Sequence, residues 1–404
     1  MSDLRQARTI ALDGTAAIER YLPASGATAW MRGGEGIIGF GEIARFEAAS
    51  LAEAAGQWNA FTKTLAHRSL IPHAHPLAFV SGVFDPSNSA GMSVIVVPES
   101  TITVRHGKAW FTTFNENLSV PEVITAPVPP MPLAEITPNG LDGREWKRAV
   151  TQAIELLAQD CELEKVVLAR AVTAKTASPI SLRQLATHLS AQYKNCWTFI
   201  VDGMVGASPE LLIRLEDGLA TSRVLAGTIP REGSTEKLSQ VLIDSDKDLR
   251  EHEYARDSVA QALEPFCSAM NVPDAPSVLR LPNVLHLASD ITGIVHDSST
   301  SALDLALALH PSAAVCGTPT ALARQAIAEL EQLDRGRYAG PIGWVDTSGN
   351  GEIAIALRCG KLNDNDPRQI ELYAGCGIIS ESDPEAEYAE TQAKLLPMLN
   401  ALGR

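Results

Sequence analysis

Three charged residues near the carboxyl terminus have the spacing of one face of a helix. Glu387, Glu390 and Lys394 follow one another at intervals of three and four residues in ESDPEAEYAETQAKLL, and such intervals bring side chains together on one helical face. Two carboxylates and an ammonium side by side suit a divalent cation beside a carboxylated substrate. Taken alone, the same spacing is also typical of a solvated helix with ordinary ion pairs.

The start of this helix and the strand before it can be placed from short signals. Ser382 and Glu385 have the spacing of a capping box, and Pro384 suits an early helical position. Just upstream, residues 374–377 (AGCG) end an apolar strand with small residues that let backbone N–H groups approach an anion closely. We therefore predict a helix that starts near Pro384 and faces a glycine-lined pocket.

Two further groups have the chemistry of a general base and a general acid. Lys165 opens the apolar strand of LEKVVLAR, where we expect desolvation to lower the pKa of its amine toward that of a base. Glu210 in GASPELLIR precedes three apolar residues, where burial raises a carboxyl pKa toward general-acid use. The alternatives are a lysine whose ammonium reaches solvent at a strand end and a glutamate paired with Arg214.

A second charged helix is predicted in SDKDLREHEYARDSV. Ser245 or Asp246 caps it, and Asp248 and Glu251 share a face. Together with Glu390 they could form an oxygen-rich magnesium site, because Mg²⁺ prefers one or two protein carboxylates plus substrate oxygens and water. The alternative is an exposed charged helix.

Other polar residues occur at the ends of predicted elements. Arg358 lies late in the strand of AIALRCG and Tyr373 lies late in ELYAG; an arginine placed in this way can grip a carboxylate in a bidentate fork. His310 ends a helix before a turn of small residues, a position that also suits a simple C-terminal cation. His73 and His75 lie among prolines without carboxylate neighbours, and we predict no metal there.

The elements that must position these groups are hairpins interspersed with helices. Asp202-Gly203 and Asp217-Gly218 are hairpin signals within apolar runs. This pattern predicts an α+β protein built on antiparallel sheets and not a βαβ array, and the glycine patterns of dinucleotide-binding or P-loop folds do not occur. Helices are expected at 50–68, 245–265, 301–309 and 320–334, and late strands at 338–346, 352–358 and 369–374.

One segment interrupts this pattern. Residues 118–140 contain six prolines and few charges, a density that regular elements do not tolerate. We interpret it as a connecting segment within residues 1–404, and composition alone permits these residues to form one domain or two. Residues 1–117 would form the first part, and residues 141–404 would carry the chemical motifs.

Composition limits the partners of the chain. With 33 basic and 48 acidic residues among 404, the net charge is -15, which opposes binding to nucleic acid or anionic membranes. The chain has neither an apolar run of membrane-spanning length nor a signal-peptide core, so we expect a cytoplasmic protein. The six cysteines lack CxxC spacing, as expected for reduced, buried thiols.

Several short motifs occur in a consistent order: KVVLAR, GASPELL, LAGTIPR, KDLREH, HPSAAVCG, YAGPIGW, ALRC, AGCGI and ESDPEAEYAET followed by a lysine. Over about residues 143–404 they resemble the chorismate-utilising enzymes, and most closely the isochorismate synthases. GEGIIGFGEIARF and FVSGVFDP are similar more loosely, so we expect the resemblance to cover the whole chain. It implies a single α+β fold with two antiparallel sheets packed as a sandwich and helices outside.

The resemblance also implies a reaction. Lys165 would activate water for attack at ring carbon 2 of chorismate, and Glu210 would protonate the departing 4-hydroxyl. The product would be isochorismate, with Mg²⁺ as the only cofactor. A dicarboxylate that enters a protein of charge -15 needs concentrated local positive charge, which a cation, Lys394 and Arg358 would supply.

The remaining roles follow the same resemblance. Glu251 and Glu390 would bind Mg²⁺, with Asp248 and Glu387 as water-mediated supports. The substrate-binding residues would be Gly227, Thr228 and Lys394 at the ring carboxylate, Arg358, Tyr373 and Gly377 at the enolpyruvyl carboxylate, and His310 near the ring hydroxyl.

Three alternatives stay open. A salicylate synthase would eliminate pyruvate from isochorismate, and a non-catalytic subunit would bind chorismate without turnover. Enzymes that aminate chorismate resemble this chain less at Lys165, and they usually take ammonia from an amidotransferase partner. We expect a monomer without such a partner, whose product feeds either siderophore or menaquinone synthesis.

Overall fold

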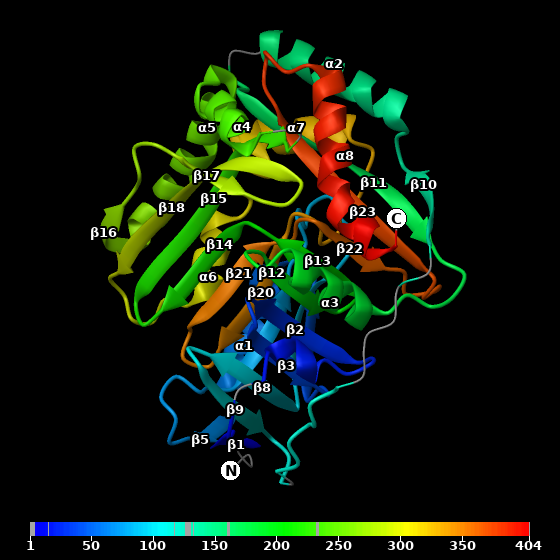
Figure 1. The fold of residues 1–404 in the computed structure, drawn as a ribbon. Coiled ribbons are helices and arrows are strands. Elements are labelled where there is room, and N and C mark those ends of the chain that lie inside the picture. The colour runs from blue at the N-terminus through cyan, green and yellow to red at the C-terminus, as the bar shows by residue number, and fades with distance from the viewer. Residues whose placement is uncertain are drawn as a thin grey trace.

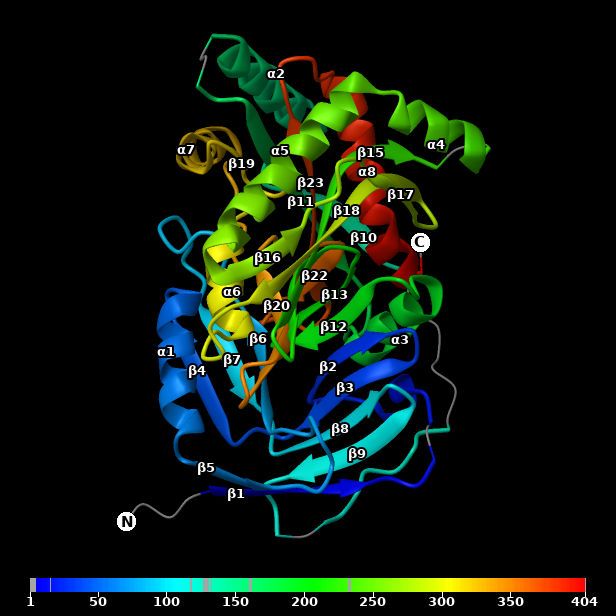
Figure 2. The same ribbon diagram turned by 90° about the vertical axis from the view of Figure 1, so that its left-hand side faces the viewer.

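Two large β-sheets form the centre of the molecule, and helices lie around them (Figures 1 and 2). The predicted α+β class with two antiparallel sheets is confirmed. The structure is a computed structural model that describes residues 5–14, 16–116, 118–125, 131, 133–159, 162–231 and 234–403.

The first sheet joins strands from both parts of the chain. Its pairings are antiparallel except for the parallel pair β1 and β5. In spatial order it contains β10 (Glu135–Asn139), β11 (Lys165–Lys175), β23 (Gln369–Ile378), β22 (Cys359–Leu362), β13 (Met204–Ser208), β12 (Trp197–Val201), β2 (Ala27–Arg32), β3 (Glu35–Phe40), β8 (Ser100–Arg105), β9 (Lys108–Thr113), β1 (Arg5–Ala11) and β5 (Leu65–Arg68), and β19 (Gly317–Thr318) pairs with β11.

The second sheet is antiparallel throughout its described pairings. In spatial order it contains β16 (Cys267–Asn271), β18 (Val284–Val295), β15 (Leu219–Pro230), β14 (Leu211–Glu216), β21 (Gly351–Ile355), β20 (Pro341–Asp346), β6 (Leu77–Ser81), β7 (Ser93–Val97) and β4 (Ala44–Ala48), and β17 (Ser277–Arg280) pairs with β18. The largest core cluster includes Trp30 and Phe199 from the first sheet and Phe79 from the second. The main core therefore draws on both sheets.

The helices pack on the outer sides of the sheets (Figures 1 and 2). They are α1 (Leu51–Thr62), α2 (Gly143–Gln159), α3 (Leu182–Gln192), α4 (Thr235–Ile243), α5 (Asp246–Leu263), α6 (Ala302–Leu309), α7 (Thr320–Leu330) and α8 (Pro384–Ala401), with short 3₁₀ turns at Ile18–Tyr21 and Glu264–Phe266. Helix α5 contacts β15 and β18, α7 contacts β11, and α8 contacts β23. None of the helices in the described part of the chain has the length and hydrophobicity that a membrane-spanning helix needs.

Both predicted hairpins are confirmed. Asp202 and Asp217 have φ of 48° and 50°, and each is followed by a glycine with positive φ. These turns join β12 to β13 and β14 to β15, because asparagine, aspartate and glycine tolerate the left-handed conformation that two-residue hairpins require.

Several element boundaries differ from the predictions. The helix expected over 50–68 ends at Thr62, because residues 65–68 pair with the distant strand β1. The connection expected over 118–140 contains β10, whose Pro138 is tolerated because β10 is an edge strand; residues 126–130 and 132 of this segment lie outside the described residues. Helix α7 ends at Leu330. The elements that were not predicted are helices α3 and α4 and strands β1, β2, β5, β8, β9, β10, β16, β17, β18, β19 and β22.

Details of two further predictions need correction. Helix α8 does start at Pro384, but its cap is Asp383, which accepts a hydrogen bond from the Ala386 N–H at 2.9 Å. The Ser382 hydroxyl instead accepts one from Ile379, so no capping box with Glu385 forms. Among the cysteines, Cys267 is half-exposed, Cys161 lies outside the described residues, and the other four are buried and free.

Candidate active site

A small cavity, which we call the reaction cavity, lies where β11, β15, β23, α5 and α8 meet. It leaves about 50 Å³ of free space. Seven residues predicted to act in the site line it, and they come from distant parts of the chain: Glu210, Thr228, Glu251, Arg358, Tyr373, Gly377 and Lys394.

Lys165 lies just behind this lining as the first residue of β11. Its side chain is fully buried, its Nζ lies 3.2 Å from Oε1 of Glu251, and it has no hydrogen-bond partner among the described residues. A Cβ at Gly377 would lie 2.2 Å from Oε1 of Glu251 and 2.8 Å from Cε of Lys165. Glycine at this position is therefore what allows the lysine and the glutamate to meet.

Glu210 is a buried acid in the gap between β13 and β14. Its side chain is 4 % exposed. Burial raises the pKa of this carboxyl to about 8, although the nearby ammonium groups of Lys165 and Lys394 act in the opposite direction. The pKa shift predicted from the sequence is confirmed, and Glu210 is protonated at neutral pH.

Three carboxylates of the predicted metal site each face an ammonium group. The pairs are Lys165 with Glu251, Lys247 with Glu387 and Lys394 with Glu390, at N–O distances of 3.2, 2.6 and 2.5 Å. Burial and the charge of Glu390 raise the pKa of Glu387 to about 7. Burial also raises the pKa of Asp248, and the charges of Glu251 and Glu390 add to that increase. The carboxylates are thus close enough to repel one another.

This cluster has the donor chemistry of a magnesium site. Hard carboxylate oxygens are the ligands that Mg²⁺ prefers, and a cation would relieve the repulsion that raises the pKa of Glu387 and Asp248. Within the described residues, however, no three acidic, histidine or cysteine side chains are arranged to hold a metal ion. The ammonium groups of Lys165, Lys247 and Lys394 contact the carboxylate oxygens that would bind a cation.

Arg358 approaches the cavity from the segment between β21 and β22. It is 7 % exposed, has φ of 49°, and its Nη2 donates to Nε2 of His286 at 2.9 Å. Because Nε2 accepts, the ring proton lies on Nδ1, which is 2.9 Å from Oγ1 of Thr228. Burial and the charges of Arg358 and Lys394 lower the pKa of His286 well below its usual value. His286 is therefore a neutral link between two predicted substrate-binding residues.

The sequence patterns did not reveal His286. It occupies the apolar strand β18 directly across from Thr228, and this neighbour is visible only once the register of β15 and β18 is known. Lys247 was also missed, although a lysine beside Asp248 was a signal in the sequence. Tyr338, which lines the cavity and stacks on Tyr373 with ring centroids 5.0 Å apart, lies in a loop without periodicity.

The other predicted residues differ in their distance from the cavity. Gly227 lies between lining residues 226 and 228, with φ of +74°, and a Cβ there would lie 3.0 Å from Asp248. His310 does not line the cavity. Its Nε2 contacts the backbone oxygen of Phe84 at 2.9 Å, and burial lowers its pKa to about 4. The structure therefore places His310 outside the lining of this cavity, and its predicted role near a ring hydroxyl stays a prediction.

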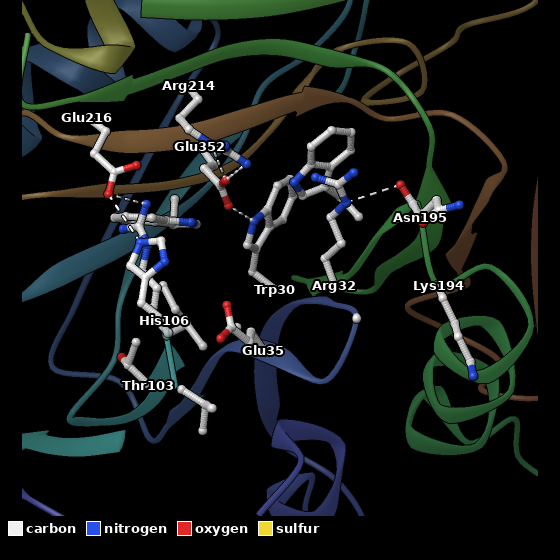
Figure 3. Close-up of a pocket in the computed structure, with 17 residues that line it drawn as sticks. Trp30, Arg32, Glu35, Thr103, His106, Lys194, Asn195, Arg214, Glu216 and Glu352 are labelled. Carbon is white, nitrogen blue, oxygen red and sulfur yellow. Dashed lines mark hydrogen bonds and ion pairs between the residues drawn. The ribbon is translucent and has the colours of Figure 1, made fainter. Parts of the chain in front are cut away.

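A second cavity, of about 360 Å³, is lined by Trp30, Trp197 and Trp344 together with several charged residues (Figure 3). We call it the indole cavity. Glu352 accepts from Nε1 of Trp30 at 2.8 Å and pairs with Arg214. The buried indole nitrogens of Trp197 and Trp344 are sealed from solvent. None of the residues predicted to act in catalysis or binding lines it.

Comparisons with known proteins identify the family of the chain. A family model described as chorismate binding enzyme matches residues 25–403, so the chain belongs to this family, and the predicted resemblance is confirmed. Isochorismate synthase DhbC of Bacillus subtilis is 40% identical over 273 residues, 64% of this chain and 68% of that protein.

A second relative and a solved structure cover more of the chain. The putative isochorismate synthase MenF of Mycobacterium tuberculosis is 36% identical over 336 residues, 79% of this chain and 84% of that protein. The structure of MenF, the menaquinone-specific isochorismate synthase from Escherichia coli, aligns with a TM-score of 0.80 at 27% identity and covers 98% of this chain and 94% of that one. The similarity therefore includes the N-terminal part that the motifs covered only loosely.

Proposed function

We propose that the protein is an isochorismate synthase, which converts chorismate to isochorismate. The observation that carries this proposal is the buried carboxyl of Glu210, whose pKa of about 8 keeps it protonated at neutral pH, in a cavity that also contacts Lys394 and Arg358. An acid held protonated beside cationic groups suits a reaction that expels a hydroxyl from an anionic substrate.

The proposed reaction balances two proton transfers. Lys165 in its neutral form takes a proton from water as the water oxygen bonds to ring carbon 2, the ring double bonds shift, and the bond from carbon 4 to its hydroxyl breaks. Glu210 donates its proton to that hydroxyl, which leaves as water. The substrate gains and loses one water, so the product is an isomer, and the two residues exchange protons with solvent to restore the starting state.

The binding groups have separate tasks in this scheme. Arg358, oriented by the neutral His286, would bind one carboxylate, with Tyr373 and Gly377 beside it. Lys394, whose Nζ donates to the Gly375 oxygen at 2.8 Å, would bind the ring carboxylate with Gly227 and Thr228.

Glu251 and Glu390 would hold Mg²⁺, with Asp248 and Glu387 as supports through water. When bound, the cation would neutralise the ring carboxylate. The cluster of carboxylates that raise one another's pKa supports this assignment.

Product analysis tests the proposal. The purified protein is incubated with chorismate, with and without Mg²⁺, the products are separated by chromatography, and a coupled assay measures pyruvate. We expect isochorismate that depends on Mg²⁺, without pyruvate. Salicylate with equimolar pyruvate would show a salicylate synthase, and binding without turnover would show a non-catalytic subunit. The product alone does not distinguish a siderophore from a menaquinone pathway.

A further inference from the structure

The strand that carries Lys165 has an interrupted edge. On one side β11 pairs with β23 along nearly its whole length. On the other side it pairs with β19 at Lys165 and Val166 and with β10 at residues 171–175. Residues 167–170 have no strand partner on this second side within the described part of the chain. Their backbone groups are buried, so they need other hydrogen-bond partners.

Side chains and a turn supply these partners. The Val167 N–H donates to the Cys316 oxygen at 2.8 Å. Arg335 Nη2 donates to the Val167 oxygen at 2.7 Å, and the Ala169 N–H donates to Oε2 of Glu331 at 2.8 Å. Trp146 Nε1 donates to the Ala169 oxygen at 2.9 Å. A glutamate and an arginine thus take the place of a strand between β19 and β10.

Glu331 and Arg335 form one buried unit just after α7. Nε and Nη2 of Arg335 donate to the two carboxylate oxygens of Glu331 at 2.7 and 2.6 Å, and the two side chains are 1 % and 3 % exposed. Arg335 Nη1 also donates to the Val315 oxygen at 2.9 Å. The pair therefore ties strand β11 to the turn at residues 312–317, and Val167, Val315 and Arg335 all line the reaction cavity.

The turn lies against Lys165 itself. Gly317 pairs with Val166, and a Cβ at Gly317 would lie 2.1 Å from the Lys165 oxygen. Any shift of the turn relative to β11 would therefore move the start of the strand, from which the Lys165 side chain reaches Glu251.

We propose that Glu331 and Arg335 are positioning residues for the reaction, which fix the start of β11 and the turn 312–317 so that Lys165 is held against Glu251 and Gly377. This inference rests on the proposed role of Lys165 as the base. A buried ion pair is a costly way to stabilise a fold, since apolar residues of similar volume often do as well or better. A planar guanidinium that donates to a carboxylate and two backbone oxygens at once fixes the orientation of these groups relative to one another, which apolar packing does not.

Two conservative variants test this role. Glu331→Gln keeps the shape but presents an NH₂ group to a donor, and Arg335→Lys keeps the charge but cannot reach Glu331, Val167 and Val315 in one fork. We expect kcat for chorismate to fall roughly tenfold to a hundredfold, because small misplacements of catalytic groups have effects of this size. KM should change by less than about twofold, because the substrate-binding groups stay in place. Amide hydrogen exchange in residues 165–170 should become faster, and exchange in β12 should not change.

Trp146→Phe is the matched control. It removes one hydrogen bond from the same edge of β11, to Ala169, but leaves the turn 312–317 tied to the strand. We expect it to lower the unfolding temperature while kcat stays within about twofold of the wild-type value. If Trp146→Phe lost as much kcat as Arg335→Lys, or if both conservative variants kept the wild-type kcat, the positioning role would be wrong.

The two proposals fail in different ways. If Glu331→Gln does not fold, the positioning role is tested with Arg335→Lys alone. If the wild-type protein does not turn over chorismate, the proposed function is wrong. Hydrogen exchange alone then tests whether Glu331 and Arg335 fix the start of β11. Unchanged exchange in residues 165–170 of a folded variant would overturn the positioning role whatever the activity.

Discussion

The reaction cavity and the indole cavity are both lined by charged residues, but these residues differ in burial. Glu210 and Arg358 in the reaction cavity are buried, whereas the charged residues of the indole cavity are half-buried or exposed. In the indole cavity, Glu352 pairs with Arg214 and Glu216 pairs with Arg105 at 3.1 Å (Figure 3). In the reaction cavity, Lys165 lies 3.2 Å from Glu251, but Glu210 forms no ion pair among the described residues and burial raises its pKa to about 8.

This difference indicates which cavity performs chemistry. Burying ionisable groups costs free energy even when they are paired, and proteins retain such costs mainly at functional sites. Perturbed acids and bases in a cleft are candidates for catalysis for the same reason. The smaller of these two cavities is therefore the candidate for catalysis.

The largest effect should come from the carboxylate cluster. We expect Glu390→Ala to reduce magnesium-dependent turnover of chorismate to background while the protein still unfolds cooperatively, because among the described residues the carboxylate forms an ion pair with Lys394 alone, on the same helix face. Binding of Mn²⁺, followed by electron paramagnetic resonance, should weaken in parallel. A variant with unfolding at a much lower temperature and unchanged Mn²⁺ binding would assign Glu390 a structural role.

The next effect should come from Lys165, the fully buried lysine beside the reaction cavity. Lys165→Ala should lower kcat by roughly 10² or more, the usual contribution of a general base. The matched control is Lys361→Ala, which removes a lysine that is paired with Asp364 at the surface and should leave kcat unchanged. Steady-state kinetics with chorismate measures both. Wild-type turnover in Lys165→Ala would remove this residue from the role of base.

The pH dependence of stability and of turnover tests the state of Glu210 in the reaction cavity. Its folded pKa of about 8 lies above its ordinary value of 4.5, so the folded state favours the protonated form. The free energy of unfolding should therefore fall as pH rises from about 4.5 to about 8, and kcat should fall above about pH 8 as the acid loses its proton.

Glu210→Gln provides the control for this pH dependence. Because glutamine does not titrate, the free energy of unfolding of the variant, measured with denaturant, should not show this fall between about pH 4.5 and about pH 8. Its kcat should be lower by roughly 10². A wild-type stability that rises over this pH range, or a variant with the same slope, would contradict the raised pKa of Glu210.

Part of this site could be predicted from the sequence and part could not. Glu210, Lys165, Glu387 and Glu390 were found because each lies within a local pattern, a charged residue beside an apolar run or a helical spacing. Helix α5 was predicted within two residues at each end for the same reason.

Long-range pairing explains the rest. His286 meets Thr228 only through the register of β15 and β18, and residues 65–68 form β5 only because β1 is beside them. His310 was assigned to the substrate from its motif, but its ring packs on Phe84, with centroids 5.9 Å apart. Local patterns identify chemistry, and non-local pairing decides which of the candidates meet.

A smaller effect should appear at the link between Arg358 and Thr228. His286→Phe would keep the ring volume but remove both hydrogen bonds. Loss of a hydrogen bond to a charged group costs about 1.5–3 kcal/mol, and about 1.4 kcal/mol is tenfold in binding. We therefore expect KM for chorismate to rise at least about tenfold with a smaller change in kcat. A lower kcat at unchanged KM would show instead that His286 acts on the transition state.

The smallest effect on turnover should come from the indole cavity. Glu352→Gln leaves the Trp30 N–H an acceptor but removes the charge that pairs with Arg214. Breaking a partly buried charged hydrogen bond should lower the free energy of unfolding by about 1–3 kcal/mol, while kcat and KM stay within about twofold of wild type. Urea unfolding and steady-state kinetics measure the two quantities on the same preparation. If Glu352→Gln lowered kcat as strongly as Lys165→Ala, the indole cavity would be coupled to the reaction, and the burial of charged groups would no longer separate a structural cavity from a catalytic one.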